Sequence, residues 1–329
     1  MDHLGNSVVH CCADCGSVAG GGISLKACKS CMLVKYCNAN CQRNHWPKHT
    51  KVCKLRAAEL HDEALFKDPP PAKEECPICF VPMPVKLISC MTLPPATITS
   101  IPIYDFAMAN QELAKEDMED YYSCCGNYIC SGCIHSLCMS GNYAHCPFCK
   151  AETMSKTNEE RIEEMMKRVE ANDAGAIYAL GSYYHHGGLG LHQDGEKEIE
   201  LWKQAARLGS SKAHHNLGNV FYEGGDMKKA KFHYEAAAIA GHEGARSNLG
   251  DIEGRSGNVE RGFKHWIIAA SAGDCNAMYN LQQAFEQGLM PREAIDLTLT
   301  AYNSSCKEMR SEARDAFIRT MAEINDHGM

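Results

Sequence analysis

The chain has 329 residues, of which 45% are hydrophobic, and its net charge is -8. This length allows two or three domains, and the mild negative charge argues against a nucleic-acid partner. The sequence has no run of 18 consecutive apolar residues, the length that marks a membrane-spanning helix, and its start does not resemble a secretory signal. We therefore expect an intracellular protein, in the cytoplasm, the nucleus or both, without a membrane segment.

The cysteines are concentrated in the first half of the chain. Of the 20 cysteines, 18 lie between Cys11 and Cys149, and many are paired as Cys-x-x-Cys. Without an export signal, such pairs are typical of zinc thiolates in a reducing compartment rather than of disulfides. The sequence therefore predicts zinc sites in this half.

The first 54 residues contain eight candidate zinc ligands. They are Cys12, Cys15, Cys28, Cys31, Cys37, Cys41, His49 and Cys53. Eight ligands suffice for two closed tetrahedral sites. His49 and Cys53 are four residues apart and would share one helix face, and Pro47 suits the first turn of that helix. We predict a zinc-stabilised module at residues 1–54, followed by a helix and a proline-rich linker at residues 55–75.

This segment resembles the MYND zinc finger through its ligand set and through the pairs Tyr36-Cys37, Cys41-Gln42 and His45-Trp46. The resemblance implies interleaved sites. One zinc would be bound by Cys12, Cys15, Cys37 and Cys41, and the other by Cys28, Cys31, His49 and Cys53. It also implies a groove for short proline-containing peptides. The alternative is that the metals only hold together a fold too small for its own core.

A second set of cysteines occupies residues 76–150. It opens with Cys76-Pro77-Ile78-Cys79, closes with Cys146-Pro147-Phe148-Cys149, and holds Cys124, Cys125, Cys130 and Cys133 in between. The arrangement resembles a RING finger, in which the first and third ligand pairs share one zinc and the second and fourth share the other. The implied sites are Cys76, Cys79, Cys130 and Cys133, and Cys124, Cys125, Cys146 and Cys149. With the first module, this predicts four zinc ions.

Two features depart from the RING pattern. Asn127 stands where the family has a zinc-binding histidine, so Cys124 has to complete the second site. The alternative ligands are His135, Cys138 and His145. The segment between the first and second pairs is also longer than usual, and we assign residues 91–122 to an insertion.

The RING resemblance implies ubiquitin transfer. Such a module binds a ubiquitin-loaded conjugating enzyme and accelerates transfer by positioning, so no catalytic residue of its own is expected. The family's partner contacts correspond to Ile78, Pro147 and Lys150. Arginine would serve better than Lys150, because its planar group donates to two acceptors at once. The alternative is a zinc-stabilised scaffold that recruits no conjugating enzyme.

The remainder of the chain repeats with a period of 32 residues. The recurring positions include Leu217, Leu249 and Leu281, and Gly209, Gly241 and Gly273. An earlier unit around Leu180 lies 37 residues before the next. Small residues let paired helices approach, and a glycine suits the end of each second helix. We predict a connecting helix at residues 151–172 and an all-α solenoid of helical hairpins at residues 173–329.

These units resemble the SEL-like repeats, relatives of the tetratricopeptide repeat, in segments such as AIYALGSYYHHG and LWKQAARLG. The resemblance implies a surface that binds other proteins. The histidines His185, His186, His214, His215 and His233 are expected to pack or face solvent rather than to bind metal. We place Trp202 and Trp266 in the core. A second glycine recurs directly after the repeated leucine, at Gly218 and Gly250; in the fourth unit Gln282 replaces it, and Pro291 precedes the second helix, so this unit should begin the cap.

The sequence thus predicts a multi-domain protein in which two small zinc-stabilised modules precede an all-α helical-repeat solenoid. The leading functional hypothesis is a RING-type ubiquitin ligase that selects its substrate through the repeats. The alternative is a non-enzymatic adaptor. No segment resembles the SET domain that accompanies MYND fingers in lysine methyltransferases, which argues against that class.

Overall fold

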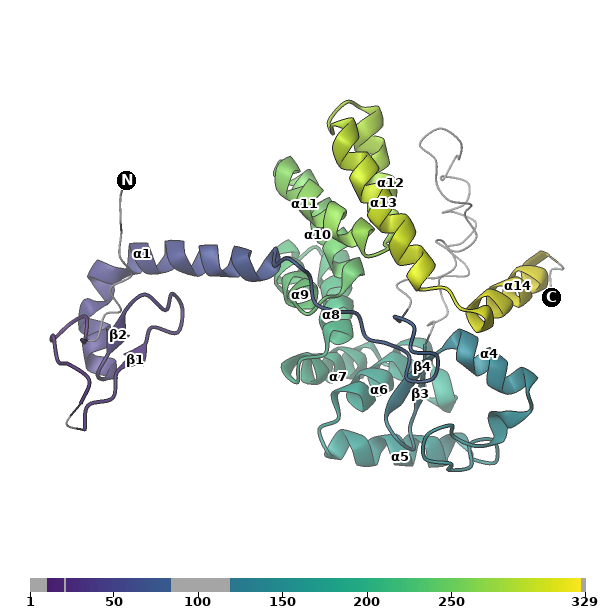
Figure 1. Cartoon of the computed structure of the whole chain (residues 1–329). Coiled ribbons are helices and arrows are strands. Elements are labelled where there is room, and N and C mark those ends of the chain that lie inside the picture. The colour runs from purple at the N-terminus through teal and green to yellow at the C-terminus, as the bar shows by residue number, and fades with distance from the viewer. Residues whose placement is uncertain (1–10, 21, 84–118, 327–329) are drawn as a thin grey trace. The chain divides into compact units, whose positions relative to one another are not determined.

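The structure, a computed structural model, describes residues 11–20, 22–83 and 119–326 (Figure 1). Of the predicted insertion at residues 91–122, all but residues 119–122 lie outside this range. The chain divides into two compact units, Met1–Pro69 and Pro70–Met329. Within the described residues, no helix combines the length and the apolar character that crossing a membrane requires.

The first unit contains two short strands and one long helix. Strands β1 (Lys26–Ala27) and β2 (Lys35–Tyr36) pair antiparallel, and α1 spans Ala39–Leu65. The prediction that Pro47 opens a helix is wrong, because Pro47 lies inside α1. The helix begins earlier because the side chain of Asn38 caps it, accepting a hydrogen bond of 2.9 Å from the amide three residues later.

Cysteines make up most of the core of the first unit. The buried cluster consists of Cys12, Cys28, Cys31, Tyr36, Cys41 and Cys53. Only Tyr36 among these offers a large apolar surface. A fold of this size buries little apolar surface, and its core consists mainly of cysteines, so we expect its stability to depend on what the cysteines bind.

The second unit opens with a small hairpin and a helix. Strands β3 (Glu119–Tyr122) and β4 (Asn127–Cys130) pair antiparallel, with Tyr121 opposite Tyr128. Helix α4 (Ser131–Met139) follows directly, and the 3-10 helix η2 (Asn142–Ala144) comes next. The core of this part places Ile129, which is fully buried, among cysteines.

From Asn158 to Asp326 the second unit consists mainly of helices (Figure 1). Helix α5 (Asn158–Glu170) begins at a capping box formed by Thr157 and Glu160. The later helices are α6 (Ala174–His186), η3 (Gly188–Gly190), α7 (Gly195–Arg207), α8 (Ser211–Glu223), α9 (Met227–Ile239), α10 (Glu243–Arg255), α11 (Val259–Ser271), α12 (Cys275–Glu286), α13 (Arg292–Glu308) and α14 (Glu312–Asp326). Helices α6 to α13 form successive hairpins, each packed on the next. The predicted helical-repeat solenoid is therefore confirmed.

The helix positions follow the period of the sequence. Helices α8, α10 and α12 begin 32 residues apart, at Ser211, Glu243 and Cys275. Helices α7, α9 and α11 keep the same step, beginning at Gly195, Met227 and Val259. The extra residues of the first repeat therefore lie between α6 and α7, where η3 is inserted. At the ends of the second helices, Gly209, Gly241 and Gly273 have φ values of 93°, 92° and 94°, as the predicted caps require.

In three hairpins a glycine on the first helix lies against an aromatic ring on the second. The pairs are Gly181 with Trp202, Gly218 with Tyr234, and Gly250 with Trp266. A Cβ atom on these glycines would lie only 2.7, 2.5 and 2.3 Å from the respective rings. In the fourth hairpin both members differ, because Gln282 and Thr298 occupy the corresponding positions. The glycine and the aromatic ring therefore form one packing feature, which the fourth hairpin replaces as a whole.

The third hairpin buries a histidine among charged side chains. His265 of α11 is fully buried. Burial, and then the positive charges of Arg246 and Arg261 with a smaller one from Lys231, lower the pKa of His265 to about 3 against the opposing effect of Glu253. An unfolded histidine has a pKa of about 6.5. The stabilisation that follows from keeping this imidazole neutral is therefore complete above about pH 6.5 and is lost as the pH falls toward 3.

We expect His265 to make the second unit acid-sensitive. Lowering the pH from 7.5 to 5 should reduce the unfolding free energy by about 2 kcal/mol. The unfolded histidine becomes protonated over about 1.5 pH units below its pKa of about 6.5, and each unit is worth about 1.4 kcal/mol. His265→Gln should remove this share of the pH dependence, as measured by urea unfolding at both pH values. His192→Gln, at an exposed position, is the control and should keep the wild-type dependence. Equal pH dependence in both variants would contradict the assignment.

Candidate metal centres

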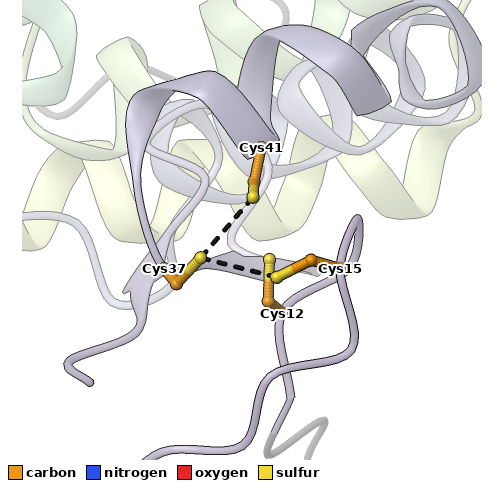
Figure 2. A group of neighbouring side chains, drawn as sticks. All are labelled: Cys12, Cys15, Cys37 and Cys41. Atoms are coloured by element: carbon orange, nitrogen blue, oxygen red, sulfur yellow. Dashed lines mark hydrogen bonds between the residues drawn. The ribbon is translucent and has the colours of Figure 1, made fainter. Parts of the chain in front are cut away.

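The first cluster of the N-terminal unit consists of Cys12, Cys15, Cys37 and Cys41, whose sulfurs all lie within 4.8 Å of one another (Figure 2). The Sγ atom of Cys37 lies 3.6 Å from that of Cys15 and 3.5 Å from that of Cys41. With Zn–S bonds of about 2.3 Å, sulfurs at the corners of a tetrahedron are about 3.8 Å apart. The spacing therefore fits a zinc ion, and it is too long for the ~2.05 Å bond of a disulfide.

The second cluster interleaves with the first along the chain. It consists of Cys28, Cys31, His49 and Cys53, all buried. Cys28 Sγ lies 3.7 Å from Cys53 Sγ, and Cys31 Sγ lies 3.2 Å from Nε2 of His49. Helix α1 supplies His49 and Cys53 from one face, as expected for residues four apart. His45, one turn earlier, lies outside the cluster and places its Nδ1 3.0 Å from the Tyr36 hydroxyl.

The thiols of the second cluster differ strongly in acidity. Burial raises the pKa of Cys28, but hydrogen bonds at the Cys31 backbone and from His49 outweigh it and bring the pKa to about 6. Burial and the neighbouring thiols of Cys28 and Cys31 raise the pKa of Cys53 to about 12. Like charges at this distance oppose the last ionisation. A divalent cation would allow all three thiols to ionise together, which is how zinc binds thiolates.

The first cluster of the RING-like part joins the first and third cysteine pairs. It consists of Cys76, Cys79, Cys130 and Cys133. The Sγ atoms of Cys76 and Cys133 lie 3.8 Å apart, and those of Cys79 and Cys130 lie 3.9 Å apart. Cys130 ends β4 and Cys133 lies in the first turn of α4. The separations again match a tetrahedral zinc site; we call this cluster the first RING-like site.

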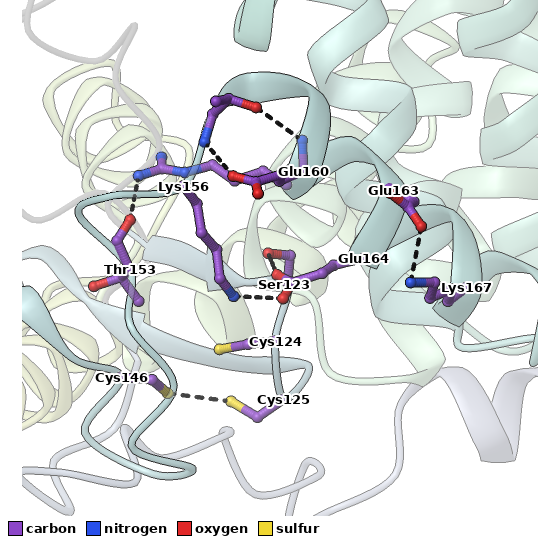
Figure 3. Close-up of polar contacts among 12 residues, drawn as sticks. Ser123, Cys124, Cys125, Cys146, Thr153, Lys156, Glu160, Glu163, Glu164 and Lys167 are labelled. Carbon is purple, nitrogen blue, oxygen red and sulfur yellow. Dashed lines mark hydrogen bonds and ion pairs between the residues drawn. The ribbon is translucent and has the colours of Figure 1, made fainter.

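The second RING-like site joins the second and fourth pairs: Cys124, Cys125, Cys146 and Cys149. Cys125 Sγ lies 3.6 Å from Cys146 Sγ (Figure 3). The adjacent cysteines occupy the turn between β3 and β4, which the Gly126 amide closes by donating to the Tyr122 carbonyl at 2.7 Å. Gly126 has a φ of +79°, which glycine adopts without strain. This tight turn is what allows neighbouring residues to direct both thiols to one site.

Asn127 stands where the RING pattern has a zinc-binding histidine. In the structure it supports the second RING-like site by donating a hydrogen bond to one of the cysteine sulfurs. Its Nδ2 donates to Cys125 Sγ at 3.3 Å. The alternative ligands lie elsewhere: His135 contacts Thr320 and Phe317, and Cys138 and His145 are exposed. The described cluster therefore contains Cys124 rather than any of these three. Sequence reasoning treated Asn127 only as a missing ligand, although its distance of two residues from Cys125 was a usable signal.

Helix α5 holds the turn that carries these cysteines. Arg168 Nε donates to the Ser123 carbonyl at 2.8 Å, and its Nη1 lies 3.0 Å from Asp173 Oδ2. Ser123 Oγ donates to Glu164 Oε2 at 2.9 Å, and Lys156 also pairs with Glu164 (Figure 3). The second site is therefore anchored to the start of the helical array. No sequence pattern pointed to this contact.

The three residues that the RING resemblance implied as partner contacts lie at or near the surface. Ile78 is half-buried against the core around the first RING-like site, Pro147 is half-buried, and Lys150 is exposed. Lys150 Nζ donates to the Pro147 carbonyl at 2.9 Å. Two large apolar side chains that the sequence did not single out, Phe80 and Met139, are 74% and 76% exposed. Their exposure depends on tertiary packing, which their residue types do not reveal.

The first helices of the repeats carry a row of amides at the 32-residue period: Asn216, Asn248 and Asn280. Asn248 Nδ2 and the Tyr234 hydroxyl both donate to Asn219 Oδ1, at 3.3 and 2.8 Å. One repeat later, Asn280 Nδ2 donates to Asp251 Oδ1 at 2.9 Å. Asn219, Tyr234, Asn248 and Asp251 help to line a cavity of about 180 Å³. This cavity, lined by polar side chains, is a candidate binding site for a polypeptide partner.

The fold and these clusters define a zinc-finger protein with helical repeats. The family model of the MYND finger, a zinc-binding domain, matches residues 12–53. These residues contain both clusters of the first unit. Four Cys/His clusters in the described residues could each bind zinc, and those of the second unit are consistent with RING-like sites.

Solved structures similar to this chain include two with Sel1-type repeats. One is a Sel1 repeat protein from Oxalobacter formigenes, with 24% identity and a TM-score of 0.41, covering 54% of this chain and 69% of that one. The other is c5321, a protective antigen present in uropathogenic Escherichia coli strains with an SLR fold. Its identity is 19% and its TM-score 0.38, covering 57% of this chain and 42% of that one.

Proposed function

We propose that the protein is a RING-type ubiquitin ligase that binds its substrate through the repeats. The observation that carries this proposal is the crossed pairing of the cysteines in the second unit, first pair with third and second with fourth. That pairing brings the two Cys-Pro-x-Cys turns and α4 into one small module. Ile78, Leu137 and Phe148, one from each of these elements, pack against the same core.

In this proposal the chain supplies positioning and no nucleophile. A conjugating enzyme would dock on the apolar residues of the two turns, around Ile78 and Pro147. Lys150 would then donate to the bound partners in place of the Pro147 carbonyl that it contacts in the free protein. Holding a thioester and an amine in a reactive geometry is sufficient to accelerate transfer.

The repeats and the MYND finger would supply the protein partners of this reaction. The polar cavity around Asn219 and Asp251 offers amide and carboxylate groups that can bind the backbone of an extended polypeptide or its cationic side chains. The MYND finger would take proline-containing peptides. Clustered thiolates persist in reducing compartments, so we place the protein inside the cell.

The test is self-ubiquitylation of the full chain with a panel of conjugating enzymes. Lys150→Arg should raise the rate roughly tenfold, because one more charge-assisted hydrogen bond is worth about 1.5 kcal/mol. Ile78→Ala should lower the rate at least as much. Leu289→Ala, which truncates a 58% exposed side chain between α12 and α13, is the matched control and should be neutral. Zinc content is measured for each variant, so that loss of metal is not mistaken for loss of docking.

The adaptor alternative draws on one observation, the presence of lysine rather than arginine at position 150. It predicts no transfer by the wild type or by Lys150→Arg with any enzyme, while zinc content stays normal. That result would replace the ligase proposal with a scaffold that joins proteins through its zinc fingers and repeats.

A further inference from the structure

A buried arginine links the last helix to the RING-like part. Helix α14 packs beside α4 (Figure 1), and Arg314 of α14 is only 1% exposed. Burying a guanidinium is costly unless it is paired and its donors are satisfied. The partners of Arg314 therefore indicate what this residue does.

The described partners of the Arg314 guanidinium are backbone carbonyls and cysteine sulfurs. Nη1 donates to the carbonyls of Pro82 and Met309, both at 2.7 Å, and Nη2 donates to the Val81 carbonyl at 3.2 Å. The remaining two contacts go to cysteines of the first RING-like site: Nε lies 3.3 Å from Cys130 Sγ, and Nη2 lies 3.8 Å from Cys79 Sγ. The carbonyls satisfy donors but carry no charge. Among these partners, only the two sulfurs can supply negative charge, and they do so as thiolates.

We propose that Arg314 is a positioning residue for the metal of the first RING-like site. A zinc ion with four thiolates carries two net negative charges. The guanidinium of Arg314 offsets part of that charge, and its N–H groups fix the directions of the Cys79 and Cys130 sulfurs. Groups that hydrogen-bond to metal ligands in this way orient them and tune the metal affinity. Arg314 thereby makes metal retention at this site depend on docking of α14, 184 residues along the chain from Cys130.

Neighbouring residues allow α14 to approach α4 closely enough for Arg314 to reach the cysteine sulfurs. Gly132, between ligands Cys130 and Cys133, leaves room for α14, because a Cβ there would lie 2.6 Å from Arg314 Cγ and 2.7 Å from its Cα. One turn along α4, the His135 ring lies edge-on to Phe317 with centroids 6.0 Å apart, and its Nε2 lies 3.3 Å from Thr320 Oγ1. The first turn of α4 therefore carries a metal ligand on one side and receives α14 on the other.

The second RING-like site is supported differently, which makes the proposal specific. There a neutral amide, that of Asn127, donates to Cys125 Sγ, and Arg168 donates to backbone carbonyls of the turn rather than to a ligand sulfur. Loss of Arg314 should therefore affect one metal site and leave the other three unchanged.

The experiment measures zinc release from the full chain. Purified protein loaded with four zinc ions, one per cluster, is mixed with a chromophoric chelator, and the release phases are followed by absorbance. Arg314→Met removes the charge and the donors, whereas Arg314→Lys keeps the charge and loses the forked geometry. Arg319→Met, at an exposed position of the same helix, is the matched control. Trapping with a thiol-alkylating reagent and mass spectrometry identifies the cysteines that are exposed first.

Loss of such a supporting contact typically lowers metal affinity 10- to 100-fold. Because weaker binding should appear mainly as faster dissociation, Arg314→Met should release one of the four zinc ions roughly 10- to 100-fold faster. The first alkylated cysteines should be those of the first RING-like site. Arg314→Lys should fall between this variant and the wild type, and Arg319→Met should match the wild type. Unchanged release, or equal acceleration at all four sites, would overturn the proposal.

A second variant addresses loss of folding in Arg314→Met. Gly132→Ala keeps Arg314 but pushes α14 away, so it should also accelerate release of the same single ion. If Gly132→Ala releases zinc at the wild-type rate while circular dichroism shows it folded, the link between α14 and the metal is disproved. The assay contains no conjugating enzyme, so its outcome is independent of the proposed ligase function.

Discussion

Replacing Cys76 with serine is expected to reduce the zinc content of the chain from four ions to three and to unfold the segments around the first RING-like site, while the second RING-like site keeps its ion. Cys76 is fully buried, and its Sγ lies 3.8 Å from that of Cys133. Binding of structural zinc is worth roughly 10 to 16 kcal/mol in small fingers. Because this is comparable to the whole stability of a typical domain, about 5 to 15 kcal/mol, the part that loses its metal has no other source of comparable stabilisation.

The measurement is zinc per chain by atomic emission, together with the rate at which the remaining cysteines react with an alkylating reagent. Cys138→Ser is the matched control, since Cys138 is an exposed cysteine of α4 outside the four clusters. It should retain four ions and wild-type reactivity. If Cys76→Ser also kept four ions, Cys76 would not be a ligand.

Leu249→Ala is expected to lower the unfolding free energy of the helical array by 2 to 5 kcal/mol, the usual cost of a leucine-sized cavity in a core. Leu249 of α10 is fully buried. Helix α10 packs against both α9 and α11, so the cavity weakens contacts within its own hairpin and with the preceding one. In a repeat array, stability is carried by such neighbouring contacts.

Urea unfolding of the zinc-loaded protein, followed by helical circular dichroism, measures this effect. Leu297→Ala provides the control, because Leu297 of α13 is 67% exposed. It should change the unfolding free energy by less than about 0.5 kcal/mol. If the two variants had equal urea midpoints, the leucines that recur every 32 residues would not mark the core.

The metal clusters could be predicted from the sequence to a large extent because cysteine spacing is a local property. A Cys-x-x-Cys pair places two sulfurs on one turn wherever it occurs, so candidate ligands such as Cys28 and Cys31 are visible without a fold. Their grouping into four sites required family resemblance, since spacing alone does not say which pairs meet. The choice of Cys124 over its alternatives depended on the β3–β4 turn, which only the three-dimensional arrangement defines.

The remaining features are contacts between residues far apart in sequence. Arg314 lies in an amphipathic helix, where an arginine that faces solvent and one that meets a thiolate give the same pattern. The period of glycines at Gly218 and Gly250 was visible, but their partners Tyr234 and Trp266 were not. The start of α1 was predicted too late because Pro47 was given more weight than the cap at Asn38. The proposed domain bounds remain predictions.

The paired glycine and aromatic ring of the first three hairpins constrain which substitutions these hairpins can accept. Enlarging Gly250 alone would force its side chain into Trp266, and truncating Trp266 alone would leave a void beside Gly250. Either change alone should therefore destabilise the hairpin, and the two positions are expected to vary together across repeats, as Gln282 and Thr298 do in the fourth hairpin. A longer array assembled from these hairpins would have to copy both helices of a hairpin from the same repeat, because a first helix from the fourth hairpin, with Gln282, would clash with Trp266 on a second helix from the third.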